Sequence, residues 1–277
     1  MISRPQLIDQ IKQKKSFLCV GLDTDINKIP QFLQEFPDPV LEFNKRIIDA
    51  TRDLCVSYKP NAAFYESRGV IGLQSLTATW EYLPKDCLNI IDAKRGDIGN
   101  TSDMYAKAFF DVSASGMSFD AITVSPYMGR DTVTAYLAYP DKWVILLALT
   151  SSAGSRDFQY LTTEKGPLYE AVIKTASTWA SADRLMYVVG ATKSTEFINI
   201  RKSAPDNFLL VPGIGAQGGN LSEVCKYGMT KDCGLLVNAS RSIIYASNGE
   251  DFAEAARAEA LSIQQQMQVE LEKAGVI

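Results

Sequence analysis

The sequence contains no histidine among its 277 residues. Histidine is the commonest general acid or base in enzymes, a member of the Ser-His-Asp triad and the usual protein ligand of zinc. Its absence excludes triad chemistry and histidine-ligated zinc sites from this chain. Any proton transfer must therefore be carried out by Lys, Asp, Glu, Tyr or Cys side chains.

Long apolar runs and a large positive charge are also missing. The longest apolar runs, such as Val144–Leu149, are far shorter than the roughly 20 residues that cross a bilayer. The N-terminal residues lack the apolar core of a secretory signal peptide. The net charge of -4 gives no reason to expect binding to nucleic acid or to anionic lipid. We therefore expect a cytoplasmic protein that contacts neither nucleic acid nor membrane.

Cysteines are few, and none is arranged for metal binding or redox chemistry. The chain has five, and no two of them form a CxxC pair. Four of the five begin or lie within short apolar runs. We expect the cysteines to be small buried core residues.

The sequence does contain a repeated alternation of short apolar runs with amphipathic stretches. Eight runs are almost continuously apolar, which is typical of parallel strands buried on both faces. These runs are Phe17–Leu22, Cys55–Tyr58, Leu88–Ile91, Ala121–Val124, Val144–Leu149, Met186–Val189, Phe208–Val211 and Leu235–Val237.

The stretches between the apolar runs have the spacing of amphipathic helices, clearest in Pro39–Asp53, Leu168–Ala182 and Asp251–Ala274. Eight strands that alternate with helices over about 250 residues predict an α/β fold, a (β/α)8 TIM barrel. We expect a single domain over residues 1–277. A doubly wound open sheet is the alternative, but it usually has a glycine-rich turn after its first strand.

Charged residues follow three of the predicted strands. Active sites of this barrel lie at the carboxyl ends of the strands, where Asp23, Lys59, Asp92 and Lys94 are found. Residues two apart on a strand face the same way, so Asp92 and Lys94 should both point to the site. An exposed salt-bridge network is the alternative interpretation. The position directly after apolar strands favours an active site.

The seventh and eighth predicted strands end in residues suited to phosphate. The stretch Pro212–Gly219 contains four glycines, so its backbone N–H groups can approach a ligand closely. We expect the next helix to begin near Gly219 and Asn220, with its positive end facing the same place. Arg241 follows the eighth strand and can supply a bidentate guanidinium. The loops after these two strands often bind phosphate in this fold. The alternative interpretation is a tight turn that needs glycine only for its backbone conformation.

The motif Asp92-x-Lys94-x-x-Asp97, followed by Ile98 and Thr101, resembles the catalytic signature of the orotidine 5′-phosphate decarboxylase family. The run of residues 92–101 is similar to the longer bacterial branch of that family. Supporting matches occur along nearly the whole chain, at Gly21–Asp23, Lys59–Asn61, Pro212–Gly219 and Ser240–Arg241.

This resemblance implies the conversion of orotidine 5′-monophosphate (OMP) to UMP and CO2, the last step of pyrimidine synthesis, without a metal or an organic cofactor. It implies that Lys94 protonates C6 of the pyrimidine and that Asp92 lies against the substrate carboxylate. It also implies a homodimer in which Asp97 reaches the active site of the other subunit. The other matched positions are Asp23 and Lys59 at the ribose hydroxyls, Thr101 as a partner-subunit contact, Ser151 at the pyrimidine, and Pro212, Gly215, Gln217, Gly218 and Arg241 at the phosphate.

One segment departs from the family pattern. Ser152 and Ala153 follow Ser151, where the longer branch has Asn-Pro. The segment Ser151–Gly166 is our candidate lid over the site. Two other functions stay open: a sugar-phosphate lyase of the same superfamily, which stabilises an enediolate with Mg²⁺, and a non-catalytic phosphate-binding protein.

Overall fold

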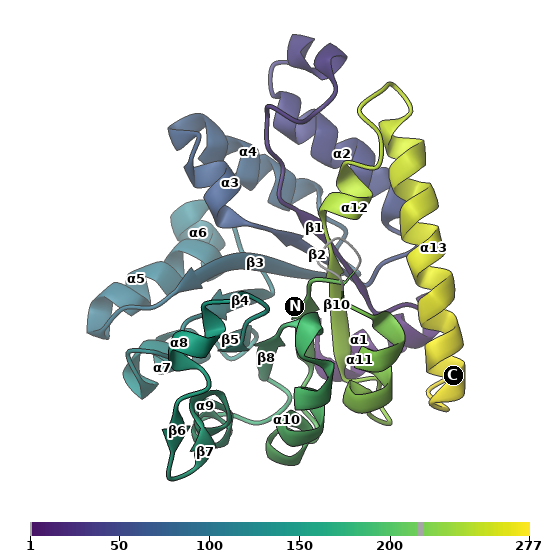
Figure 1. Ribbon diagram of the computed structural model, residues 1–277. Coiled ribbons are helices and arrows are strands. Elements are labelled where there is room, and N and C mark those ends of the chain that lie inside the picture. Colours follow the sequence, from purple (N-terminus) through teal and green to yellow (C-terminus); the bar gives the residue numbers. More distant parts are fainter. Residues whose placement is uncertain (1, 215–218) are drawn as a thin grey trace.

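The computed structural model describes residues 2–214 and 219–277. Within these residues eight parallel strands close into a barrel in the order β1-β10-β9-β8-β5-β4-β3-β2, with helices around the outside (Figure 1). The closed barrel confirms the predicted fold and excludes an open doubly wound sheet. The strands are β1 (Leu18–Leu22), β2 (Ser57–Pro60), β3 (Leu88–Arg95), β4 (Ala121–Val124), β5 (Trp143–Leu149), β8 (Leu185–Val189), β9 (Leu209–Pro212) and β10 (Leu235–Ala239).

Helices and a small extra hairpin fill the connections between these strands. No helix in the described ranges combines the length and the apolar character needed to span a membrane. Two short strands, β6 (Thr162–Thr163) and β7 (Gly166–Pro167), pair with each other outside the barrel. The helices are α1 (Arg4–Lys14), α2 (Pro39–Thr51), α3 (Ala62–Glu66), α4 (Gly69–Tyr82), α5 (Gly99–Phe110), α6 (Val112–Ser115), α7 (Arg130–Leu137), α8 (Ser155–Phe158), α9 (Leu168–Ala176), α10 (Phe197–Ser203), α11 (Leu221–Gly228), α12 (Arg241–Ile244) and α13 (Phe252–Lys273), with 3-10 helices η1 (Gln31–Glu35) and η2 (Ala191–Glu196).

The predicted helix Leu168–Ala182 is too long, because α9 ends at Ala176. The next residues form a turn in which the Thr178 N–H donates to the Thr175 carbonyl at 3.1 Å. The Thr178 hydroxyl donates to the same carbonyl at 2.7 Å. Hydroxyl side chains compete in this way for backbone groups and favour turns over helix interiors.

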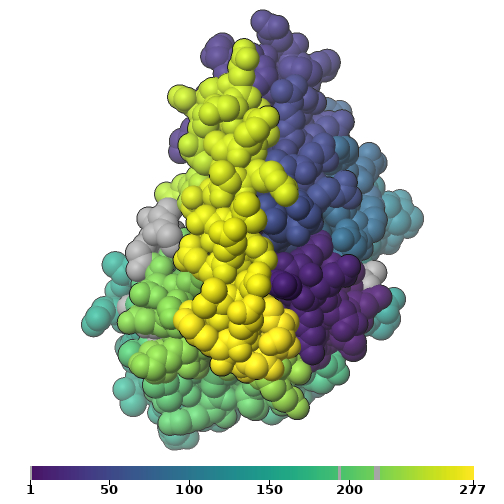
Figure 2. Space-filling view, turned by 90° about the vertical axis from the view of Figure 1, so that its right-hand side faces the viewer, coloured from purple at the N-terminus to yellow at the C-terminus, as the bar shows by residue number. Residues whose placement is uncertain are grey.

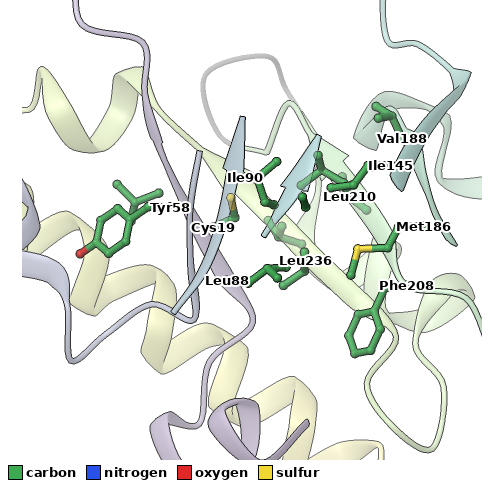
Figure 3. Packing of buried hydrophobic residues seen from close by; sticks show 14 of the residues in the cluster. Cys19, Tyr58, Leu88, Ile90, Ile145, Met186, Val188, Phe208, Leu210 and Leu236 are labelled. Carbon is green, nitrogen blue, oxygen red and sulfur yellow. The ribbon is translucent and has the colours of Figure 1, made fainter. Parts of the chain in front are cut away.

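Strand residues alternate between the barrel interior and the surrounding helices. Figure 3 shows Cys19, Ile90 and Leu236 gathered in the interior, whereas Tyr58 points away from them. The Tyr58 hydroxyl hydrogen-bonds with Thr51 on α2 at 2.8 Å. Since neighbours on a strand face opposite ways, Lys59 points into the barrel. All five cysteines are buried free thiols, as predicted.

The C-terminal helix α13 packs against the N-terminal part of the chain. In Figure 2 it runs beside the N-terminal segment and α2. The Gln264 amide donates to the carbonyls of Lys14 and Lys15, each at 3.1 Å. Arg257 forms a bidentate ion pair with Asp53 at 2.7 and 2.8 Å. These contacts support the pairing of β1 with β10 that closes the barrel.

Arg201 on α10 joins the loops at the opposite end of the barrel from the strand carboxyl ends. Its guanidinium donates to four carbonyl oxygens, those of Gly228 at 2.7 Å, Ala204 at 3.0 Å, Asn207 at 2.7 Å and Gly234 at 2.8 Å. Burial lowers the pKa of Arg201 to about 10, so the group is still charged at neutral pH. One planar cation thus connects the ends of α10 and α11 with the residues that precede β9 and β10.

We expect Arg201→Met to lower the free energy of unfolding by about 2–4 kcal/mol, because it removes a charged donor from several carbonyls that water does not fully reach. Arg257→Met is the matched control. That arginine is 44% exposed, and exposed ion pairs contribute about 1 kcal/mol or less. Urea unfolding of both variants measures the difference, and equal losses would show that Arg201 has no special role.

Candidate active site

A cavity of about 370 Å³ lies at the carboxyl ends of the barrel strands. It is lined by five of the predicted site residues, namely Asp23, Lys59, Asp92, Pro212 and Arg241. The remaining lining residues are Lys28, Asn61, Phe64, Gly213, Ile214, Asn238, Ser240, Ser242 and Tyr245. The structure therefore brings together predicted site residues that are as much as 218 positions apart, from Asp23 to Arg241.

Alternating charges form a chain of contacts on the floor of this cavity. Lys59 Nζ lies 3.0 Å from Asp92 Oδ2 and 3.9 Å from Asp23 Oδ1. Lys94 Nζ lies 2.6 Å from the other Asp92 oxygen, Oδ1. Lys94 is not among the lining residues itself, but its ammonium is in contact with one that is. The Asp92 carboxylate is thus held between two ammonium groups.

Two charged groups of this cluster, Lys59 and Asp92, are buried, so each one strongly affects the pKa of the other. The side chains of Lys59 and Asp92 are 5% and 9% exposed. Burial by itself would raise the pKa of Asp92, but the charges of Lys59 and Lys94 outweigh it and hold that pKa well below its usual range. Burial would likewise lower the pKa of Lys59, and the charges of Asp92 and Asp23 instead raise it. Both groups are therefore ionised throughout the neutral range.

A bulge in β3 brings Lys94 to Asp92. β3 pairs with β4 at Ile91 and again at Arg95, and the register shifts between these residues. Lys94 lies inside the bulge with φ of 45°, so it is not in strand conformation. Asp92 and Lys94 do lie close together, but the regular strand alternation from which the sequence predicted their shared direction is not the reason. The bulge changes the direction of the Lys94 side chain, as bulges beside active sites often do.

Asp97 and Thr101 lie beyond this cluster in the single chain. The Asp97 carboxylate accepts a hydrogen bond from the Ile98 N–H at 2.8 Å, and among the described residues it makes no ion pair. Thr101 is exposed on the first turn of α5. One chain alone therefore does not bring Asp97 to Lys94.

The candidate lid, Ser151–Gly166, is folded rather than extended, and it contains α8, β6 and the first residue of β7. Thr150 lies directly before this segment, and its N–H donates to Gln159 Oε1 within the segment at 2.8 Å. Ser151 follows β5 and packs against Gly190 so closely that a Cβ on the glycine would lie 2.5 Å from the Ser151 nitrogen. Ser151 does not line the cavity, and its predicted pyrimidine contact is still a prediction.

The predicted phosphate end begins at Pro212, the last residue of β9. Gly213 follows with φ of 99°, a conformation that only glycine adopts readily. The Gly219 N–H donates to the Gly213 carbonyl at 3.1 Å, which holds these two residues close together. Three of the predicted phosphate contacts lie outside the described residues, namely Gly215, Gln217 and Gly218.

Positive groups lie near Gly213 and Gly219. α11 begins with Asn220 as its N-cap residue, where the sequence predicted a helix start. Arg241 opens α12, lines the cavity and is exposed. Its guanidinium makes no ion pair with any residue in the described ranges, so it is available to an anionic ligand.

The sequence analysis missed two residues that hold the site. The Tyr245 hydroxyl accepts from the Asp25 N–H at 2.7 Å and donates to the Asp23 carbonyl at 3.0 Å. It thereby fixes the loop that carries the Asp23 carboxylate. The Thr123 hydroxyl donates to Asp92 Oδ1 at 2.8 Å. Thr123 lies within a predicted strand, where a threonine is an ordinary residue and gives no sign of a role at the site.

We expect Asp92→Asn to lower the free energy of unfolding at neutral pH, because it leaves the buried Lys59 ammonium without its nearest counter-charge. The folded-state pKa of Asp92 is depressed, so its contribution is complete above the unfolded pKa of about 3.9 and is lost as the pH falls below that value. The stability difference between wild type and variant should therefore be constant from about pH 8 to pH 5 and shrink toward pH 3. A pH series of urea unfolding curves measures it, and a difference that grows on acidification would contradict the assignment.

Comparison with known proteins places the chain among relatives of similar length. Residues 16–257 match the model of the orotidine 5′-phosphate decarboxylase / HUMPS family. The chain is 60% identical over 265 residues to a protein of Flavobacterium johnsoniae named orotidine 5′-phosphate decarboxylase, covering 95% of this chain and 96% of that one. It is 56% identical over 274 residues to a protein of the same name from Bacteroides fragilis, with 98% of each chain covered.

The fold agrees with these sequence matches. The structure of Leishmania donovani OMP decarboxylase superposes with a TM-score of 0.80 and 34% sequence identity, covering 96% of this chain and 99% of that one. The family model spans most of the barrel, including the stretch that carries Asp92 and Lys94. The chain belongs to the orotidine 5′-phosphate decarboxylase / HUMPS family.

Proposed function

We propose that this protein decarboxylates OMP to UMP and CO2, the last step of pyrimidine synthesis. The observation that carries the proposal is the Asp92 carboxylate, clamped between the ammonium groups of Lys59 and Lys94 at 3.0 and 2.6 Å on the cavity floor. Relatives 60% and 58% identical over nearly their full lengths are named orotidine 5′-phosphate decarboxylase. Both lysines and the aspartate belong to the motifs on which the sequence resemblance rests.

The substrate would lie across the cavity with its phosphate at the turn after β9. Arg241 is exposed and without an ion pair in the described part of the chain, which supports a role in binding the phosphate dianion. Asp23 and Lys59 would contact the ribose hydroxyls. Asp23 Oδ1 is buried and has no hydrogen-bond donor among the described residues, and a ribose hydroxyl would satisfy it. Binding energy from the distant phosphate would orient the pyrimidine over the charge chain.

The chemical step breaks the bond between C6 and the carboxylate carbon. The electron pair of that bond stays on C6 while neutral CO2 leaves. The Lys94 ammonium, fixed by Asp92, stabilises the charge that develops at C6 and then donates a proton to it. A preorganised cation of this kind lowers the barrier because it needs no reorientation during the reaction. Solvent returns the proton to Lys94 after UMP is released.

The position of Asp92 adds a second contribution. Its carboxylate would face the carboxylate of the substrate, and two anions at close range repel each other strongly in a buried site. When neutral CO2 leaves, the negative charge moves from the substrate carboxylate to C6, and protonation by Lys94 then neutralises it. Repulsion present in the bound substrate and absent in the product would favour bond cleavage. The depressed pKa of Asp92 supports this role, because a carboxyl that stayed protonated could not repel the substrate.

We further propose a homodimer in which Asp97 and Thr101 reach the active site of the partner subunit. In the described part of one chain, Asp97 makes no ion pair that would hold it in its own site. Both residues adjoin an exposed apolar surface formed by Ile98 and Met104, which are 57% and 59% exposed. A mainly apolar groove also lies between α4 and α5, lined by Val70, Leu73 and Tyr105 among others. Exposed apolar surface of this kind is typical of subunit contacts.

The first test is decarboxylation itself. We expect purified protein to convert OMP to UMP, with loss of the orotidylate ultraviolet absorbance, at a rate that EDTA does not change. A strict requirement for Mg²⁺, or activity only on a keto-sugar phosphate, would instead indicate a lyase that stabilises an enediolate with a metal.

The second test removes the proton donor. We expect Lys94→Ala to lower kcat by several orders of magnitude, since one group supplies both charge stabilisation and the proton. The circular dichroism spectrum should be unchanged, because the Lys94 side chain is 47% exposed. Lys273→Ala is a matched control, because Lys273 is 61% exposed, pairs with Glu270 on α13 and does not line the cavity. Near-normal turnover by Lys94→Ala would refute the mechanism.

The third test concerns the shared site. When Lys94→Ala and Asp97→Asn chains exchange subunits, each hybrid dimer should contain one intact and one doubly altered site. Random pairing of equal amounts makes about half of the dimers hybrid, so roughly a quarter of wild-type activity should return. Absence of recovery, with exchange confirmed by native mass spectrometry, would show that Asp97 acts in its own subunit.

A further inference from the structure

Thr123 on β4 is the single residue that faces the bulge of β3. The ladder pairs Ile91 with Ile122 and then Arg95 with Val124. Three residues of β3 thus lie opposite Thr123 alone, and the backbone N–H groups within the bulge lose regular strand partners. A bulge normally leaves its extra residues unpaired, so these N–H groups need another acceptor if they are buried.

The Thr123 hydroxyl supplies that acceptor. Its Oγ1 accepts hydrogen bonds from the N–H of Ala93 at 3.0 Å and from the N–H of Lys94 at 2.9 Å. It donates its own proton to Asp92 Oδ1 at 2.8 Å. A hydroxyl has one proton and two lone pairs, and all three are used here. The direction of the bond to Asp92 is therefore fixed, because both lone pairs are already occupied.

Burial makes the hydroxyl hard to replace. Thr123 is 1% exposed, so water cannot readily take over its three hydrogen bonds. Lys94 holds φ of 45°, which is unfavourable for a residue with a Cβ and persists only where the surroundings impose it. The bond from the Lys94 N–H to Thr123 is one such constraint. Without it the bulge could relax toward regular strand geometry and carry the Lys94 side chain away.

The same hydroxyl also fixes the partner of Lys94. Asp92 Oδ1 receives both the Thr123 hydroxyl at 2.8 Å and the Lys94 ammonium at 2.6 Å. Oδ2 of Asp92 is bound by Lys59. Thr123 therefore contacts the Lys94 backbone on one side and the Lys94 counter-ion on the other, without lining the cavity itself.

We propose that Thr123 is the positioning residue of the active site, and that its hydroxyl sets the distance between the Lys94 ammonium and the Asp92 carboxylate. This inference rests on the proposed decarboxylation, in which that ammonium donates the proton to C6. Thr123 would act on the catalytic step through Lys94 and Asp92, and not on substrate binding at the phosphate end. Its removal should consequently lower kcat and leave KM for OMP and the affinity for UMP nearly unchanged.

Two substitutions separate the hydroxyl from the volume of the side chain. Thr123→Val keeps the shape and removes the hydroxyl, whereas Thr123→Ser keeps the hydroxyl. We expect Thr123→Val to lower kcat on the order of 10- to 100-fold, the cost of orphaned buried partners, with KM within about twofold of wild type. Thr123→Ser should return most of the rate. Thr123→Ala serves in place of Thr123→Val if the valine variant does not fold.

A merely structural role would give a different pattern. In that case Thr123→Val would lower Tm, while kcat per folded molecule would stay within about twofold of wild type. That result would overturn the proposal. A rise in KM at constant kcat would overturn it as well, since it would place the effect on binding. Equal loss of kcat in Thr123→Ser and Thr123→Val would show that the hydroxyl is not responsible for the effect on kcat.

Crystal structures of the two variants keep this test separate from that of the proposed function. If the wild type fails to decarboxylate OMP, the proposed function is wrong, and the positioning of Lys94 is then judged from geometry alone. We expect the contact between Lys94 Nζ and Asp92 Oδ1 to be lost in Thr123→Val and kept in Thr123→Ser. Retention of the contact and of the left-handed Lys94 backbone in both variants would refute the inference.

Discussion

The Asp92 carboxylate lies between two ammonium groups at the end of a barrel strand, and the arrangement of the site depends on this contact. Lys59 approaches one carboxylate oxygen at 3.0 Å and Lys94 the other at 2.6 Å. An ion pair at about 4 Å is worth about 4 kcal/mol at an effective dielectric of 20, which is enough to keep both partners charged. Removing Asp92 would leave both ammonium groups without the carboxylate that they share. The cluster therefore acts as a unit, and the conformations of its side chains are set together.

The barrel supplies these charges through three different local geometries. Regular strand alternation points Tyr58 outward to α2 and Lys59 inward. At the end of β3 that alternation is interrupted by a bulge, and Lys94 reaches Asp92 from a left-handed backbone. The loop after β1 brings Asp23 to Lys59, and the Tyr245 hydroxyl holds that loop. Each geometry is local, yet all three converge because parallel strands end on the same rim.

The sequence predicted the architecture well and the details of the site in part. Eight apolar runs identified the barrel strands because strands buried on both faces must be apolar throughout. Asp23, Lys59 and Asp92 were found from their positions at strand ends, and they do meet. The bulge was not predictable, because no glycine or proline marks it and Lys94 is an ordinary residue for a strand terminus. Thr123 was missed for a related reason, since a threonine inside a strand gives no sign that its hydroxyl replaces ladder partners.

We propose that the Lys94 ammonium, held by Asp92, exchanges a proton with C6 of the pyrimidine. Microscopic reversibility offers a direct test, because a group that protonates C6 must also remove a proton from C6 of bound UMP. The measurement is the exchange of the UMP C6 proton for deuterium in D2O, followed by proton NMR, with wild-type protein and Lys94→Ala. We expect exchange with wild type and none above the protein-free rate with the variant. Equal exchange rates for the two proteins would contradict it.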